Sequence, residues 1–201
     1  MSIFIARHGQ NEDNAESILN GHRDRPLTEL GRRQAMELAL GIEKLGLRFS
    51  KVYSSPLCRA LETAEIVASK NGLEAPEIVD SLIERDFGIL TGRPHSDIPV
   101  VCGDNVIKTD TITYFLEPEG AETFPQLLER AKNAMEEIKF KKDEGDILVV
   151  CHGDLGEMLY AAATGTGWKE VLLGFHFGNG ELIDIEQNGS THLVKLEQFN
   201  I

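Results

Sequence analysis

The 201-residue sequence has no hydrophobic run that approaches the ~18 residues of a membrane-spanning helix. Its first six residues are apolar only briefly and then meet Arg7-His8, with no basic stretch before them, so we expect no signal peptide. Cysteine is scarce, and the three cysteines are odd in number and lack the spacing of a metal site. They are Cys58, Cys102 and Cys151. These shortages predict a reduced, cytoplasmic setting.

Positive charge is also in short supply. The 20 lysines and arginines face 33 aspartates and glutamates, which gives a net charge of −13. This balance argues against nucleic acid or an anionic membrane as a partner. A negatively charged substrate would be repelled at long range, so any anion site must depend on a local group of cations. The 41% hydrophobic content is that of an ordinary globular protein, and the length predicts one domain, 1–201.

Short apolar runs alternate with long helical patterns, which predicts an α/β fold: a three-layer α/β/α sandwich around a mostly parallel central sheet. The runs Ile3–Ala6 and Ile147–Val150 are continuously apolar, as expected of central strands that are covered on both faces. The predicted strands are Ser2–Ala6, Lys51–Ser54, Glu77–Val79 and Ile147–Cys151.

Helices are predicted from apolar spacing and end signals. Thr28 is expected to be an N-cap, Pro56 to lie in a first turn, and Asp154 to begin a later helix as its N-cap. A further helix is expected from Phe124 to Ile138.

Two further segments have their own signals. Asn188-Gly189 lies between Leu182–Glu186 and His192–Leu196, which predicts a C-terminal hairpin at or near the sheet edge. Such an edge leaves a homodimer open as one option. Glycines and prolines interrupt the stretch around 88–118, so we expect an irregular insertion there, near the active site, that acts as a lid or substrate wall.

The chemistry-bearing residues follow the predicted strands. Arg7-His8-Gly9 comes directly after the first strand, His152-Gly153 follows Cys151, and Arg59 lies just beyond the strand that ends at Ser54. Ligands bind beyond the carboxyl ends of parallel strands, so two histidines and two arginines should meet at one sheet edge. Alone, such a histidine is more often structural and such an arginine more often a surface ion-pair partner. Together they favour an anion-binding active site.

The sequence resembles the histidine phosphatase superfamily, in its phosphoglycerate mutase-like branch and especially its small phosphatases. The resemblance covers nearly the whole chain and rests on an ordered set of motifs. They are Arg7-His8-Gly9-Gln10, Asn14, Asn20-Gly21, Pro26–Gly31, Ser54–Leu57 with Arg59-Ala60, Glu62–Ala64, Leu82 with Glu84-Arg85, Phe87-Gly88, Pro118–Gly120 with Glu122, and Val149–Gly153.

The resemblance implies roles that simple chemistry supports. His8 would attack phosphorus and become a phosphohistidine, which requires a neutral ring with one nitrogen held as a donor. Arg7 and Arg59 would bind phosphoryl oxygens, and His152 would stabilise charge in the transition state. The remaining pocket residues that it implies are Asn14, Asn20, Gly21 and Gly153.

Glu84 is the candidate general acid and base of the implied reaction. The alternative is a surface carboxylate paired with its neighbour Arg85. We expect no metal and no cofactor, because positive side chains already neutralise the phosphate and no carboxylate set suggests magnesium.

The predicted function is hydrolysis of a small phosphorylated metabolite. A phosphoglycerate mutase is the first alternative, but the acid excess of the segment after Glu84 fits a hydrolase better. A non-catalytic phosphate-binding relative would usually have lost one of the five catalytic residues, and all are present. A metal hydrolase built on His8 and His152 lacks accompanying carboxylate motifs.

Asp154 departs from the family pattern, which usually has a small or neutral residue after His152-Gly153. A carboxylate there competes with phosphate for positive potential. We therefore expect weakened phosphate affinity, or a substrate whose own cation meets Asp154.

Overall fold

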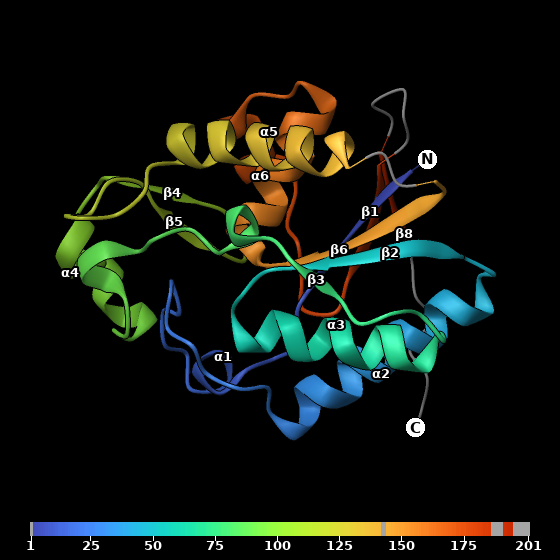
Figure 1. The fold of residues 1–201 in the computed structure, drawn as a ribbon. Coiled ribbons are helices and arrows are strands. Elements are labelled where there is room, and N and C mark those ends of the chain that lie inside the picture. The colour runs from blue at the N-terminus through green and yellow to red at the C-terminus, as the bar shows by residue number, and fades with distance from the viewer. Residues whose placement is uncertain (1, 142–143, 186–190, 195–201) are drawn as a thin grey trace.

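A six-stranded sheet forms the centre of the molecule in a computed structural model, which describes residues 2–141, 144–185 and 191–194 (Figure 1). The strand order is β3-β2-β6-β1-β7-β8. Neighbouring strands among β1, β2, β3 and β6 pair in parallel, whereas β7 and β8 add an antiparallel hairpin. The strands are β1 (Ile3–Arg7), β2 (Phe49–Ser54), β3 (Glu77–Ile78), β6 (Asp146–Cys151), β7 (Leu182–Ile185) and β8 (Thr191–Val194).

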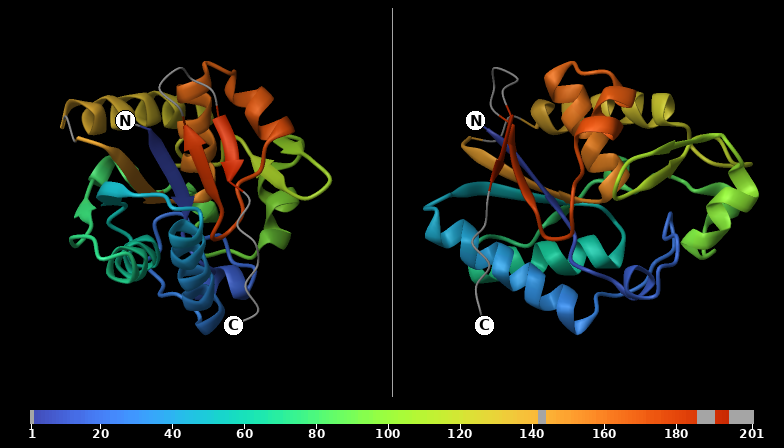
Figure 2. Two further views of the ribbon diagram at one scale, coloured as in Figure 1. Left: turned by 90° about the vertical axis from the view of Figure 1, so that its right-hand side faces the viewer. Right: turned by 180° about the vertical axis from the view of Figure 1, so that it is seen from behind.

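The C-terminal hairpin lies at the edge of this sheet, beside β1, as Figure 2 shows. The prediction of a mostly parallel sheet with an edge hairpin is therefore confirmed. The predicted turn, Asn188-Gly189, lies outside the described residues.

Helices cover both faces of the sheet and make three layers, which confirms the predicted sandwich (Figure 1). One face carries α2 (Glu29–Lys44) and α3 (Cys58–Lys70); the other carries α5 (Phe124–Phe140), α6 (Gly153–Thr164) and α7 (Trp168–Gly174). Alternate residues of β1 enter opposite layers, because side chains alternate along a strand. Ile5 packs with the α5–α6 side, and Phe4 with the α2–α3 side.

Of the three predicted helix-start signals, one is confirmed and two are wrong. Thr28 is the N-cap of α2, as predicted, and its hydroxyl accepts from the backbone N–H of Gly31 at 3.0 Å. Pro56 precedes α3, which begins at Cys58, so its placement in the first turn is wrong. Asp154 is not an N-cap either, because His152 has that position and α6 begins at Gly153.

The strand register brings the expected strand ends together. Arg7 of β1 pairs with Cys151 of β6, so His8 and His152 follow side by side. The backbone N–H of His8 donates to the Cys151 carbonyl at 3.0 Å. Ser54 of β2 pairs with Val150 on the other side of β6. Three strands thus end at one edge, as the sequence pattern predicted.

The segment 88–118 is more regular than predicted. It contains two short 3₁₀ turns, helix α4 (Ile98–Cys102) and a two-stranded ribbon, β4 (Val106–Lys108) and β5 (Thr113–Phe115). The glycines and prolines of the predicted insertion separate these short elements. Figure 1 places α4, β4 and β5 together at one end of the molecule. Phe87, Leu90, Ile98 and Phe115 give this end a small core of its own.

A third 3₁₀ turn and a short helix lie outside the insertion in the described part of the chain. Helix α1 (Glu12–Ala15) follows β1, and a 3₁₀ turn, Asp80–Leu82, precedes Glu84. The two turns in the insertion are Gly88–Leu90 and His95–Asp97. Within the described ranges, no helix is both long and apolar enough to cross a membrane.

Candidate active site

His8 is buried at the end of β1 with its tautomer fixed by its neighbours. Its Nδ1 lies 2.6 Å from the carbonyl oxygen of Gly9, and Arg59 Nε lies 3.1 Å from its Nε2. A carbonyl only accepts and a guanidinium only donates, so Nδ1 carries the hydrogen and Nε2 the lone pair. Burial, then the charges of Arg59 and Arg7, lower the pKa of His8 well below 6.5. The ring is therefore neutral and nucleophilic at neutral pH.

Two guanidinium groups flank this ring. Arg59, in the first turn of α3, is fully buried and is also held by the carbonyls of Arg23 and Gly21, at 2.7 and 3.1 Å. Burial lowers the pKa of Arg59 to about 10, so it remains charged at neutral pH. Arg7 donates from Nη1 to the carbonyl of Phe177 at 2.5 Å, and its Nε is buried without a partner. An unpaired buried donor of this kind points to a bound anion.

His152 lies beside His8 at the end of β6. The two ring centres are 5.1 Å apart in an edge-to-face arrangement. His152 Nε2 lies 2.7 Å from the Ser55 hydroxyl, while its buried Nδ1 has no partner. Burial, followed by Arg59, lowers the pKa of His152 well below 6.5.

Glycines permit the close approaches that the site requires. A side chain at Gly153 would put its Cβ 3.2 Å from the guanidinium carbon of Arg7, which packs directly on that backbone. A Cβ at Gly9 would come within 2.3 Å of the Gly31 carbonyl oxygen, so the turn after His8 can pass α2 only with glycine there.

The segment after β1 provides an amide-rich wall. Asn11 caps α1, and its side-chain amide pairs reciprocally with that of Asn20, at 2.6 and 3.3 Å. Asn14 accepts from Asn179, whose amide also donates to the His8 carbonyl at 2.8 Å. Gly21 has a positive φ of 51° and contributes its carbonyl to Arg59.

Glu84 is buried, with 6% of its surface exposed. The backbone N–H groups of Arg85 and Leu155 donate to its Oε1 at 2.8 and 3.1 Å. Burial, followed by the charge of Asp154, raises the pKa of Glu84 above 4.5. A buried carboxyl with a raised pKa is suited to donate a proton. The alternative of a surface carboxylate paired with Arg85 is wrong.

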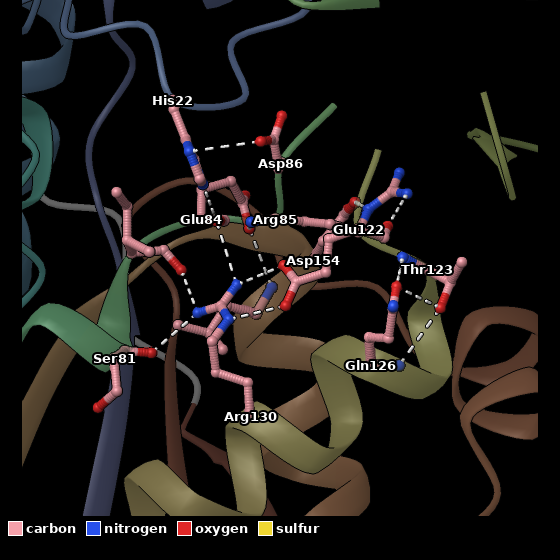
Figure 3. Close-up of polar contacts among 12 residues, drawn as sticks. His22, Ser81, Glu84, Arg85, Asp86, Glu122, Thr123, Gln126, Arg130 and Asp154 are labelled. Atoms are coloured by element: carbon pink, nitrogen blue, oxygen red, sulfur yellow. Dashed lines mark hydrogen bonds and ion pairs between the residues drawn. The ribbon is translucent and has the colours of Figure 1, made fainter. Parts of the chain in front are cut away.

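The backbone that carries Glu84 is fixed by Arg130 of α5 (Figure 3). Arg130 donates to three carbonyls, those of Ser81, Ile83 and Glu84, at 2.8, 2.7 and 3.2 Å. The Glu122 carboxylate holds the same guanidinium through two hydrogen bonds, at 2.8 and 2.7 Å. Glu84 is thus carried on a firmly held loop.

Arg85 pairs with Asp154 instead of Glu84, as Figure 3 also shows. Its Nε lies 2.7 Å from Asp154 Oδ2, and its guanidinium carbon lies 4.2 and 4.3 Å from the ring centres of Phe115 and Phe124. The cation that meets Asp154 is therefore the chain's own. Weakened phosphate affinity caused by Asp154 stays a prediction.

A cavity of about 360 Å³ connects these groups. Arg7, His8, Asn14, Asn20, Arg59, Glu84 and Gly153 all line it, together with Asp154. Its other walls come from α6, the segment 88–118 and the residues after α7, and include His95, Tyr114, Glu157 and His176. His152 and Gly21 support the lining residues through the contacts given above.

Several residues of the site were missed by the sequence analysis. Arg85 and Arg130 resemble surface cations in the sequence, and Asn179 lies in a turn far from His8. Glu157 lies at a position of α6 that the apolar pattern leaves polar, which gives no sign that Tyr114 covers it. The one available signal was the i, i+3 spacing of Asp154 and Glu157 on a helix next to the strand end.

The arrangement can perform one kind of chemistry well. A neutral imidazole, whose Nε2 lone pair faces Arg59, lies near two guanidinium groups, and a carboxyl group with a raised pKa shares the same cavity. Guanidinium groups match phosphoryl oxygens in charge and geometry. Among the described residues, no three histidine, cysteine or acidic side chains gather as metal ligands.

Comparisons with known proteins agree with this chemistry. The sequence profile of the histidine phosphatase superfamily, branch 1, matches residues 3–199. The chain is similar to a 2,3-bisphosphoglycerate-dependent phosphoglycerate mutase of Parvibaculum lavamentivorans, with 34% identity across 98% of this chain and 95% of that protein. It is also similar to the solved structure of the α-ribazole phosphatase of Shigella flexneri, with 26% identity, a TM-score of 0.77, and coverage of 98% and 96%. A mycobacterial glucosyl-3-phosphoglycerate phosphatase solved with VO3 has 25% identity, a TM-score of 0.80 and 96% coverage of both chains.

Proposed function

The chain belongs to the histidine phosphatase superfamily, and we propose that within it the protein is a metal-independent phosphatase of a small phosphorylated metabolite. Relatives of both kinds, phosphatases and mutases, are similar to it. The choice between them depends on what the cavity offers beyond the phosphate.

The first step transfers the phosphoryl group to His8. The Nε2 lone pair attacks phosphorus while Arg7 and Arg59 bind the phosphoryl oxygens, and the bond from phosphorus to the ester oxygen breaks. The leaving oxygen takes the proton of Glu84. The Nδ1 hydrogen stays on the ring, where the Gly9 carbonyl stabilises the positive charge that the ring gains.

The second step releases phosphate. Glu84, now a carboxylate, takes a proton from a water molecule, whose oxygen attacks phosphorus as the bond to Nε2 breaks. Glu84 and His8 return to their starting protonation states. The charges of Arg7 and Arg59 offset the phosphoryl charge, which supports metal independence.

One observation favours a phosphatase over a mutase. A mutase must hold the carboxylate and second phosphate of a doubly anionic glycerate, which requires further cations. The segment 88–118 is fully described, and it contributes no lysine or arginine to the cavity lining. Arg93 is half-exposed and pairs with Asp97, and Lys108 is exposed. Arg85 also lines the cavity, but its charge is offset by Asp154, which its Nε contacts at 2.7 Å.

The test is a metal-free screen of sugar phosphates, glycerate phosphates and nucleotides, with EDTA present, for wild type and His8→Ala. We expect phosphate release by the wild type, loss of turnover in His8→Ala, and an acid-labile, base-stable phosphate on the wild-type protein. Unchanged turnover in His8→Ala would refute the proposal.

A phosphoglycerate mutase is the second candidate, favoured by the 34% identity to a named mutase. It is tested by following 3-phosphoglycerate with and without 2,3-bisphosphoglycerate. Isomerisation that exceeds phosphate release would favour the mutase. A cytoplasmic location is a further proposal, supported by three cysteines that form no disulfide in the described chain.

A further inference from the structure

One wall of the cavity carries acidic side chains, whereas its phosphate end carries arginines. Asp154 and Glu157 lie three residues apart on α6, which puts them on one face of the helix, and both line the cavity. Arg85 supplies one cation to Asp154 at 2.7 Å. Two carboxyl groups therefore share this wall with one guanidinium.

One carboxyl oxygen of Glu157 is available for a further hydrogen bond. The residue is 1% exposed. Its Oε1 accepts from the Tyr114 hydroxyl at 2.9 Å and lies 3.4 Å from His176 Nδ1. Its Oε2 is buried and has no hydrogen-bond partner. A buried acceptor without a donor is costly, so this oxygen points to a donor that arrives with a ligand.

We propose that Glu157 recognises a protonated amine on the alcohol portion of the substrate, so that phosphate monoesters of amino alcohols are preferred. This inference rests on the proposed phosphatase function and names its substrate class. The phosphoryl group would lie between Arg7 and Arg59, and the ammonium group would donate to Glu157 Oε2.

An ammonium group fits this wall better than a neutral hydroxyl. A hydroxyl supplies a donor only, whereas an ammonium also supplies the positive charge that the second carboxyl lacks. Burial raises the pKa of Glu157 to about 7, so the empty site holds much of it as the neutral acid near pH 7. An arriving ammonium group would favour the carboxylate and release that proton.

The distance along α6 between the phosphate end and Glu157 suits a short substrate. Arg7 packs on Gly153, and Glu157 lies four residues further along α6. Four residues of α-helix rise about 6 Å. A phosphate at Arg7 and an amine at Glu157 would therefore be separated by a linker of a few carbon atoms.

The experiment measures kcat/KM for three matched series with two, three and four carbons: ω-aminoalkyl, ω-hydroxyalkyl and simple alkyl phosphates. We expect the amine to be preferred over the hydroxyl by tenfold or more at the best chain length. Equal rates, or a preference for the hydroxyl, would overturn the inference and leave the phosphatase function standing. No His8-dependent turnover of any ester would instead overturn the function.

Glu157→Gln removes the charge and keeps an acceptor for Tyr114. In this variant the amine-to-alkyl ratio should fall to that of the hydroxyl series, while the exposed Glu136→Gln, with the same chemical change, should keep the wild-type ratio. An unchanged ratio in Glu157→Gln would contradict the inference. If this variant does not fold, the substrate series on the wild type still decides.

Discussion

Burial disfavours the charged form of four ionisable groups around the cavity. Burial lowers the pKa of His8 and His152 and raises the pKa of Glu84 and Glu157. For the histidines, nearby arginines add to burial; for the glutamates, Asp154 does. These shifts favour a neutral nucleophile, His8, and a protonated acid, Glu84, which is the combination that the first chemical step needs.

The raised pKa of Glu157 predicts a stability change with pH. In the folded protein its pKa is about 7, against an ordinary 4.5. Between these values the unfolded chain binds fewer protons, so folding stability should fall as pH rises through this window and level off above it. Its facing groups are Tyr114 from β5, His176 after α7 and Asp154 on α6.

Glu157→Gln should therefore be more stable than wild type at pH 8, by at most about 3 kcal/mol, and gain little at pH 4.5. Denaturant unfolding at both values measures this. The exposed Glu136→Gln serves as control and should show no such dependence. A gain of equal size at both pH values would contradict the prediction.

At the scale of elements, continuous apolar runs predicted the strands that matter most. Ile3–Ala6 and Ile147–Val150 proved to belong to central strands, because only covered strands can be apolar on both faces. The prediction that His8 and His152 lie close together followed from this strand assignment, because neighbouring parallel strands end at the same edge of a sheet. The contacts of Arg85 and Arg130 could not be predicted. Arg85 meets Asp154 across 69 residues of sequence, and no local pattern encodes such a pairing.

Helix α5 is expected to control catalysis through Arg130, which positions the Glu84 loop without lining the cavity. In Arg130→Met the loop loses three carbonyl contacts, and Glu84 should shift. Because small misplacements of a catalytic group cost up to ~100-fold, kcat for alkyl phosphates should fall on the order of 10-fold to 100-fold, with KM changed far less.

Substrates with different leaving groups distinguish a positioning role of Arg130 from a general loss of active-site structure. p-Nitrophenyl phosphate needs little help from an acid, so Arg130→Met should retain more of its turnover than of alkyl phosphate turnover. Arg32→Met, which removes an exposed pair with Glu62, is the control and should leave both rates unchanged. Equal losses on both substrates would count against a positioning role.

At the scale of the whole molecule, the net charge of −13 contrasts with two arginines at the phosphate end of the cavity. These arginines come from β1 and α3, and Gly153 of α6 packs against one of them. A bound phosphate would touch residues from both helical layers and the sheet between them. The binding free energy of phosphate would therefore stabilise the whole fold against unfolding.

Inorganic phosphate should therefore stabilise the protein against global unfolding. At 100 times its Kd the gain is about 2.7 kcal/mol, which for a chain of this length corresponds to a Tm rise of roughly 5–10 °C. A thermal melt against phosphate concentration measures this, with potassium chloride of equal ionic strength as control. A rise that chloride reproduces in full would mean that phosphate does not occupy the site.

The contact between Arg7 and the Phe177 carbonyl joins residues 170 positions apart. On the ribosome, His8 leaves the exit tunnel long before Phe177 and Asn179 do. Strand β1 must also wait for β6 before it gains a parallel partner. The phosphate end of the cavity therefore cannot be completed until the segment that carries Phe177 and Asn179 has been synthesised.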